Sequence, residues 1–421
     1  MNYALKKNRR RLLIKRSDII TFFLAILFIE IDSFPYIFSK IPGFVYSLLP
    51  LALSFLLVAF TLIEKRKISS SLCIVFVLFL WFLFITAWKS KRALYPAVSQ
   101  MSSAMSLAIL TEYNLSRNRW SFFRVLYAAF LVLLAIDIST ILLFPKGLYQ
   151  TALYTNNWFL GYKSARVRAI SIPGIAVAAV LSISNYNKLN LKFWLFCFLA
   201  IADAALSGAT SGSVSLVFYV VILFFLFSSK SERVRKTILK LVNPWIVLIL
   251  VISLNVAFAI LQRFELFEFF ITSVLDKDIT LTNRTQIWGA SLMLFLKSPW
   301  VGNGYIVSSD YVLITNLIRG TQPHNLFLAI LVYSGLVGLA VYAVLLINSS
   351  MQTGVTKSNL TVIIYFGIII YILFGITSIT MFAPFHYAFF VMVYYFSRCD
   401  TTKLGGFGLF RTDKAFPADP A

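Results

Sequence analysis

The side chains best suited to chemistry gather in one polar stretch of the chain, residues 283–338. Arg284 precedes Trp288 by one helical turn, and His324 and Asn325 stand where the next apolar segment begins. The planar guanidinium of an arginine donates paired hydrogen bonds to phosphate oxygens and keeps its charge near lipid. A histidine can accept a proton near neutral pH. We therefore interpret this stretch as the working face of an enzyme, with His324 as the candidate base.

A second basic stretch, residues 145–168, supplies further candidate ligands for an anion. Two or three arginines in one place would suit a lipid-linked pyrophosphate. Over both stretches, the basic candidates are Lys163, Arg166, Arg168, Arg284 and Arg319. The aromatic rings that could stack on sugars are Trp158, Trp288, Trp300 and Tyr305. Each ring could instead belong to the aromatic belt that many membrane proteins carry.

Several of these residues also have a structural interpretation. His324 could serve as a capping or hydrogen-bonded residue at the membrane interface, and the weaker alternatives for the base are Asp310 and Asp276. Asp137 and Asp203 lie inside apolar segments, where a charge facing lipid is costly. We therefore expect both carboxylates to face the interior of a bundle and to pair with arginines of the outer face.

Other kinds of chemistry are excluded by what the sequence lacks. With only two histidines and no HExxH motif, the number of ligands rules out a histidine-rich zinc site. The three cysteines are scattered, which fits neither a disulfide framework nor a metal knuckle. The chain has no GxSxG, Walker A or GxGxxG motif. We expect an enzyme that needs no cofactor and no metal.

The composition places these residues in a membrane. Of 421 residues, 59% are hydrophobic and 13% are charged, and the mean hydropathy is +0.83. Apolar runs of roughly 18 to 22 residues match the thickness of a bilayer. The net charge of +22 comes in short basic clusters between these runs, as expected for cytoplasmic loops. We expect membrane lipids as partners and no nucleic acid.

The apolar runs predict an all-α polytopic membrane protein with about twelve transmembrane helices and a large extracytoplasmic helical segment. The predicted spans are 19–38, 42–63, 70–88, 94–110, 125–144, 169–186, 193–206, 213–228, 244–262, 325–346, 360–378 and 381–396. Both termini are expected in the cytoplasm, because basic clusters are costly to translocate.

The predicted domain organisation is simple. We expect one transmembrane domain over residues 1–400, with outer segments at about 145–168 and 263–322, and a cytoplasmic, disordered tail over residues 401–421.

The order of residues in the first stretch resembles the signature region of the O-antigen polymerase and ligase family. The matching positions are Arg284, Trp288, Ser298, Pro299, Gly302, Gly304, His324, Asn325, Gly335 and Gly338. The family consists of inner-membrane glycosyltransferases of the C-type (GT-C) fold, which act on undecaprenyl-pyrophosphate-linked glycans. The second stretch lies where the family carries another functional arginine. One departure is the turn SGATSGS near residue 210, which has no arginine where many members have a Ser-Arg pair.

The resemblance implies roles for individual residues. Arg284 and one of Arg166 or Arg168 would hold the pyrophosphate, with Lys163 and Arg319 nearby, and His324 would match the histidine near the acceptor. Trp288, Tyr305, Asn325 and Trp158 are the candidate substrate-binding residues. An acceptor hydroxyl would attack the donor's anomeric carbon while the lipid pyrophosphate leaves, and fixed arginines would stabilise its growing charge. A flippase and a polysaccharide chain-length regulator are possible partners.

Three functions remain open at this stage. The first is a polymerase of O-antigen, capsule or exopolysaccharide, which the stretch TNNWFLGYKSARVR favours. The second is a ligase that moves finished polymer to a lipid A core, as in lipopolysaccharide. The third is a flippase or other transporter, which usually shows two similar halves and midplane charges. The halves of this chain differ, with one large outer segment late in the chain, and most of its unusual charge is expected on the outer side. We expect a bacterial cytoplasmic-membrane enzyme whose active site faces the periplasm or exterior.

Overall fold

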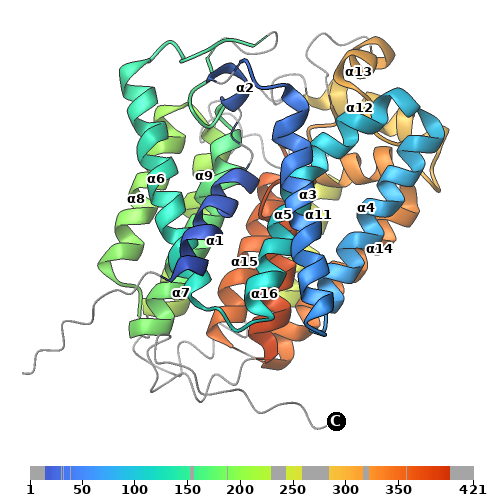
Figure 1. Ribbon diagram of the computed structural model, residues 1–421. Coiled ribbons are helices and arrows are strands. Elements are labelled where there is room, and N and C mark those ends of the chain that lie inside the picture. Colours follow the sequence, from blue (N-terminus) through green and yellow to red (C-terminus); the bar gives the residue numbers. More distant parts are fainter. Residues whose placement is uncertain are drawn as a thin grey trace, which may run out of the picture.

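The chain folds into a bundle of helices in a computed structural model (Figure 1). The structure describes residues 15–29, 31, 33–37, 39–151, 156–186, 188–228, 243–257, 284–315, 322–356 and 358–398. The longer helices are α1 (Arg16–Phe28), α3 (Gly43–Ile63), α4 (Ser70–Lys89), α5 (Leu94–Leu115), α6 (Ser121–Leu143), α7 (Ile172–Tyr186), α8 (Leu191–Leu206), α9 (Thr210–Ser228), α11 (Pro244–Asn255), α12 (Arg284–Lys297), α14 (Leu326–Thr356), α15 (Asn359–Phe374) and α16 (His386–Arg398). The short elements are α2 (Phe34–Ile37), the 3₁₀ turn η1 (Lys91–Ala93), the π-helical turn η2 (Val167–Ser171) and α13 (Ser308–Thr315). Within these described ranges, β pairing is limited to two isolated bridges, Tyr149 to Asn157 and Trp158 to Gly161.

The helices confirm a multi-pass membrane protein. A helix overlaps each of the twelve predicted spans. Six helical stretches are long and apolar enough to cross a membrane: Phe44–Ile63, Ser70–Lys89, Ser121–Leu143, Val167–Tyr186, Thr210–Ser228 and Leu326–Gly354. Helices suit this environment because they satisfy their own backbone polar groups where no water is present. The number of crossings and the GT-C fold stay predictions.

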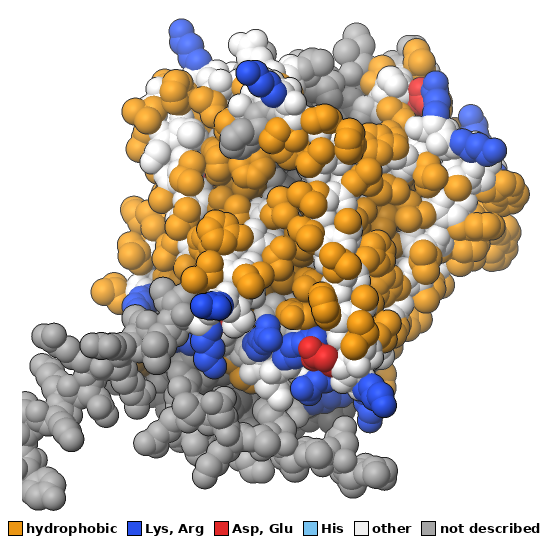
Figure 2. Space-filling view, in the orientation of Figure 1, with side chains coloured by type: hydrophobic (Ala, Val, Ile, Leu, Met, Phe, Trp, Pro, Cys, Tyr) orange, Lys and Arg blue, Asp and Glu red, His pale blue; other side chains and the backbone are white. Residues whose placement is uncertain are grey.

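The loops of the bundle gather at two opposite ends. At one end, the turn after α3 lies against the end of α5, where Arg117 pairs with Glu64 at 2.9 Å. At the same end, Glu112 of α5 accepts hydrogen bonds from Ser69 and from Tyr395 of α16. The other end, here called the site end, comprises residues 86–93, 144–151, 156–168, 298–315 and 322–325. Figure 2 shows a broad apolar band, with Lys and Arg side chains at its upper and lower margins. This pattern fits helices that run between two aqueous surfaces.

The centre of the bundle is formed by α5, α7, α15 and α16. Most residues of α15 are buried, and α16 packs against α4, α5, α14 and α15. Helix α12 packs against α14, so the helix that begins at Arg284 is attached to the longest helix of the bundle. The central helices therefore fix the segments that meet at the site end.

Helix α14 is broken at Gly335, whose φ of 64° and ψ of −165° are not helical. A break of this kind removes helical partners from backbone N–H and C=O groups. In an apolar bundle, such groups must find other protein partners, because an unsatisfied polar group costs several kcal/mol there.

A tight turn over residues 298–304, here called the plug, supplies those partners. Four backbone hydrogen bonds join it to α14: Leu336 N–H to Pro299 C=O (2.9 Å), Val337 N–H to Trp300 C=O (3.1 Å), Asn303 N–H to Val332 C=O (2.8 Å) and Gly304 N–H to Tyr333 C=O (3.0 Å). The side chain of Asn303 also donates to the Leu294 carbonyl at the end of α12, at 2.9 Å. The plug thus satisfies the broken helix and ties it to α12.

Two glycines make this close approach possible. Gly302 and Gly335 both have left-handed backbones, with φ of 82° and 64°. A Cβ atom on Gly335 would lie 2.4 Å from the Trp300 carbonyl oxygen, and a Cβ on Gly302 would lie 2.6 Å from the Gly335 nitrogen. The Ser-Pro-x-x-Gly-x-Gly pattern therefore has a structural reason, which is to let two backbones meet without side chains between them.

We predict that Gly335→Ala lowers the thermal midpoint of the protein in detergent. The left-handed backbone alone should cost about 1–3 kcal/mol, and the overlap with Trp300 adds to it. Gly354→Ala, in the same helix but with open space around the new methyl group, is the matched control. Equal melting of both variants, measured by thermal size-exclusion chromatography, would contradict the role given to the break.

Candidate functional site

Arg284 is held at the site end by the helix that it begins. One turn further along α12, Trp288 is fully buried, together with Ile287 and Leu294 of the same helix. This apolar face anchors α12 against α14. Arg284 itself is partly exposed. The anchoring of α12 therefore sets the position of the guanidinium.

Three basic residues from distant parts of the sequence converge here. The pKa of Lys163 lies below its usual value because the amine is partly buried and because the Arg284 charge is nearby. The pKa of His324 is lowered to about 4 by burial and by the same Arg284 charge. Like charges shift each other in this way only when they are close. Lys163 and His324 thus both lie within electrostatic reach of Arg284, and we name these three residues the basic site.

The backbone at His324 is unusual. Its φ of 48° lies in the left-handed region, which few residues other than glycine adopt and which histidine adopts more often than most. Such strain persists only where the surroundings impose it, and it is concentrated at functional sites. The pKa differs from the near-neutral value that we expected from the sequence, because burial and Arg284 both disfavour the charged imidazole.

Asn325 supplies part of this imposed geometry. Its side-chain oxygen caps α14 by accepting a hydrogen bond from the Leu328 N–H at 3.0 Å. Its amide nitrogen donates to Asn255 Oδ1 at 3.1 Å and to the Ile376 carbonyl at 3.2 Å. Asn325 is fully buried, so it supports the backbone next to His324, and its role in substrate binding stays a prediction.

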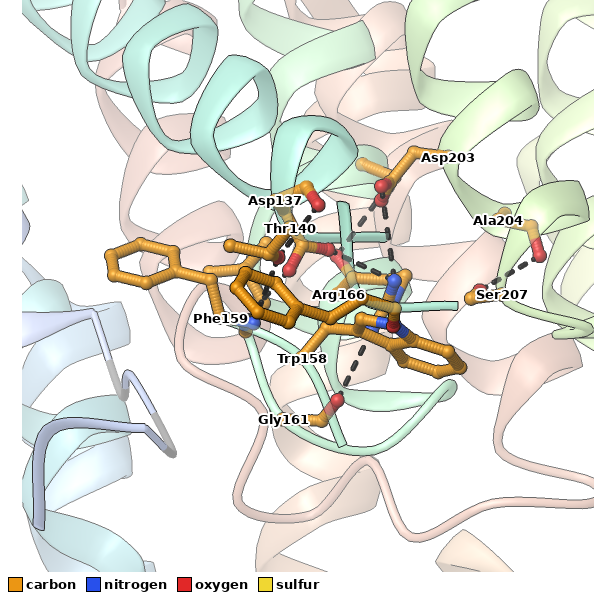
Figure 3. A network of polar contacts seen from close by, with 12 residues as sticks. Asp137, Thr140, Trp158, Phe159, Gly161, Arg166, Asp203, Ala204 and Ser207 are labelled. Carbon is orange, nitrogen blue, oxygen red and sulfur yellow. Dashed lines mark hydrogen bonds and ion pairs between the residues drawn. The ribbon is translucent and has the colours of Figure 1, made fainter. Parts of the chain in front are cut away.

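Arg166 has a different environment from the basic site. It is completely buried, and its Nη1 atom lies 2.9 Å from Asp137 Oδ2 in α6 and 3.8 Å from Asp203 Oδ1 in α8. Its Nη2 atom donates to the Gly161 carbonyl at 3.0 Å. Figure 3 shows the guanidinium between the two carboxylates, with the Trp158 ring beside it. The expectation that Asp137 and Asp203 pair with an arginine is confirmed, and the arginine belongs to the second basic stretch.

This environment argues against a pyrophosphate contact by Arg166. Asp137 and Asp203 already surround the guanidinium, and a further anion would meet the negative charge of these acids in a medium of low dielectric. Of the two arginines offered by the sequence, Arg168 therefore stays the candidate. It is partly exposed, and its carbonyl accepts a hydrogen bond from Tyr371 at 2.6 Å, which ties it to α15 near the residues that hold Asn325.

The candidate sugar-binding aromatics have structural positions as well. Trp158 is 5% exposed and donates from its ring nitrogen to the Phe144 carbonyl at 2.9 Å, while its ring stacks 5.1 Å from the Arg166 guanidinium carbon. Trp288, which is part of α12, is fully buried. Both rings are buried in this structure, and their role in sugar binding stays a prediction.

The remaining candidates stay predictions. Tyr305 is partly exposed, with its ring packed near those of Phe82, Tyr333 and Phe382. Arg319 lies outside the described residues, as does Asp276. Asp310, the other weak candidate for the base, pairs with Arg92.

The described residues contain no group of three His, Cys, Asp or Glu side chains that could hold a metal ion. The independence of the reaction from metal stays a prediction.

Comparison with known proteins identifies the part of the chain that carries Arg284 and His324. Residues 195–343 match the family model Wzy_C, described as O-Antigen ligase. The matched region extends from α8 into α14 and includes Asp203, the plug and two members of the basic site, whereas Lys163, Arg166 and Asp137 precede it. No curated protein and no solved structure matches the chain.

We predict that Arg284→Gln raises the pKa of His324. Removing the positive charge removes one of the two causes that hold the imidazole neutral. The pKa can be measured by NMR of ring-labelled histidine in nanodiscs, with His324→Gln used to assign the signal. Lys297→Gln, at the far end of α12 and exposed, should leave the value unchanged. A His324 pKa that ignores Arg284 would show that the two groups are not neighbours.

Proposed function

We propose that the protein is a polysaccharide polymerase that joins undecaprenyl-pyrophosphate-linked repeat units at the outer face of a bacterial cytoplasmic membrane. The observation that carries this proposal is that Lys163 and His324 both lie within electrostatic reach of Arg284, while Arg284 and His324 fall in the region that matches the O-Antigen ligase model. The family supports a lipid-linked glycan as the substrate. The orientation, with both termini in the cytoplasm, rests on the charge bias of the loops.

The anion is the part of the donor that this site fits best. A pyrophosphate would relieve the repulsion among the three basic groups, and the fork of Arg284 can bind two of its oxygens. Lys163 and Arg168 would add charge from the second stretch, and Arg319 remains a further candidate. As the bond between the anomeric carbon and its phosphate oxygen breaks, negative charge grows on the leaving lipid pyrophosphate, and these cations stabilise it.

His324 is the proposed base. It stays neutral at physiological pH because its pKa is about 4, so it can accept the proton of the acceptor hydroxyl as the new glycosidic bond forms. An imidazolium beside Arg284 alone would be costly. The proton transfer becomes easier once the donor pyrophosphate cancels the Arg284 charge, since the negative charge raises the pKa of His324.

A ligase that transfers the finished polymer to a lipid A core is the second candidate, because the matching family model is described as O-Antigen ligase. Both reactions use the same donor and the same leaving group, so the basic site serves either. The preference for a polymerase rests on the second basic stretch, which resembles that of capsule and exopolysaccharide polymerases. A flippase is the third candidate, and it would bind the donor without consuming it.

We predict that the purified protein in nanodiscs converts a lipid-pyrophosphate-linked repeat unit into a ladder of products, with EDTA present. Arg284→Ala should lower turnover by about 10²–10³-fold, and Arg284→Lys should fail to restore it, because a point charge does not replace a bidentate fork. His324→Ala should also abolish the ladder. Lys297→Ala is the control on the same helix.

The outcomes of this assay separate the candidates. Transfer only when a lipid A core is added would make the protein a ligase. Substrate binding with no product from either acceptor would favour the flippase. Normal ladders from Arg284→Ala would end the proposed mechanism.

We further predict that the pH profiles of kcat/KM and kcat differ on their acid sides. The kcat/KM profile reports the free enzyme, so its acid limb should lie near the pKa of about 4 for His324. The kcat profile reports the donor complex, where the pyrophosphate raises that pKa, so its acid limb should lie at higher pH. Coincident limbs would show that the donor's charge does not reach His324.

A further inference from the structure

The buried Arg166 does more than join two helices. Asp137 uses one carboxylate oxygen for Arg166 at 2.9 Å and the other to accept the Leu160 N–H at 2.8 Å. Arg166 in turn donates to the Gly161 carbonyl at 3.0 Å. The loop is therefore held on its backbone at two successive residues, both times through the same ion pair. We name Asp137, Arg166 and Asp203 the buried clamp.

Further contacts keep this loop on α6. The Phe159 N–H donates to the Thr140 hydroxyl at 3.2 Å, and the Trp158 ring nitrogen donates to the Phe144 carbonyl at 2.9 Å. The Trp158 ring also covers the Arg166 guanidinium. Figure 3 shows Trp158, Phe159 and Gly161 on the loop that passes beneath the clamp. The loop has little freedom between residues 157 and 161.

Lys163 lies in the short segment between the two ends of the clamp. It follows Gly161 by two residues and precedes Arg166 by three. The chain is therefore fixed on both sides of Lys163, at Gly161 and at Arg166. The Arg284 charge also contributes to the lowered pKa of Lys163, so the two side chains lie within electrostatic reach of each other. The position of Lys163 relative to Arg284 therefore depends on the contacts of the buried clamp with Leu160 and Gly161.

We propose that Asp137 and Asp203 are positioning residues for an anion site, because they hold Arg166 and, through it, the loop that presents Lys163 to Arg284. The ligand class is a pyrophosphate, free or as the head of a lipid. This proposal rests on the proposed function for the identity of the donor, but not for the binding of the anion. The two acids thus act through Arg166 and Lys163, without touching the ligand.

The test is a double-mutant cycle on the affinity for inorganic pyrophosphate, measured by isothermal titration calorimetry on the full chain in nanodiscs. Asp137→Asn keeps the shape of the side chain but removes the charge that holds Arg166. Lys163→Ala removes the residue through which the clamp acts. We expect each variant to weaken binding about tenfold, and the double variant to bind no more weakly than either one, because coupled residues are not additive.

The matched control is Arg92→Gln, which breaks the ion pair between Arg92 of η1 and Asp310 of α13, at the same end of the bundle. It should bind pyrophosphate as the wild type does. A general loosening of the site end would instead weaken binding in the control as well. If Asp137→Asn does not give a folded protein, Asp203→Asn takes its place, since its contact with Arg166 is longer, at 3.8 Å.

Three results would overturn the proposal. One is unchanged pyrophosphate affinity in a folded Asp137→Asn or Asp203→Asn variant. Another is a double variant whose losses multiply to about a hundredfold, which is the expectation for independent effects. The third is a wild type that does not bind pyrophosphate at all. A wild type that binds pyrophosphate but makes no glycan product would leave this proposal standing and end the proposed function instead.

Discussion

A charge inside an apolar bundle needs a charge of opposite sign beside it, and the placement of Arg166 follows from this constraint. Its guanidinium is fully buried, and its partners come from α6 and α8. Removing one partner of such a pair typically costs about 3–5 kcal/mol, because the other charge is left unbalanced. Helices α6 and α8 and the loop before η2 therefore cannot separate without exposing or stranding a charge.

Uncharged backbone groups at the site end are under a similar constraint, because a buried N–H or C=O group needs a hydrogen-bond partner. The break at Gly335 is satisfied by the plug, and the start of α14 is capped by Asn325, which also reaches Asn255 and Ile376. These polar contacts join α11, α12, α14 and the end of α15. The side chains of the basic site are consequently carried by segments whose backbones are fixed, which is what preorganised electrostatic catalysis requires.

The sequence predicts the helices well, because long apolar runs leave few alternatives in a membrane. It also predicts the pairing of Asp137 and Asp203 with an outer arginine, because burying them alone would be too costly. It does not predict which arginine. Arg166 and Arg168 are two residues apart, and the π-helical turn at Val167–Ser171 changes the helical spacing that would decide which of them points inward.

The burial of Trp158, Trp288 and Asn325 was also beyond the sequence. Tryptophan is common both at membrane interfaces and in sugar sites, and neither residue type nor spacing distinguishes these from a core position. The role of the plug could have been inferred in part, since two glycines after a Ser-Pro turn indicate left-handed backbone. The sequence does not indicate that this turn pairs with a helix break at Gly335, further along the chain.

The separation of the clamp from the basic site has an electrostatic consequence. In the clamp, Arg166 lies against two acids of opposite charge. In the basic site, burial and the Arg284 charge both lower the pKa values of Lys163 and His324. For His324 the change from 6.5 to about 4 corresponds to roughly 3 kcal/mol against the charged imidazole. An arriving pyrophosphate removes part of that penalty, so anion binding and proton uptake by His324 favour each other, as linkage requires. The base would then gain strength only when the donor is in place, which protects the enzyme from taking up a proton before there is a leaving group to stabilise.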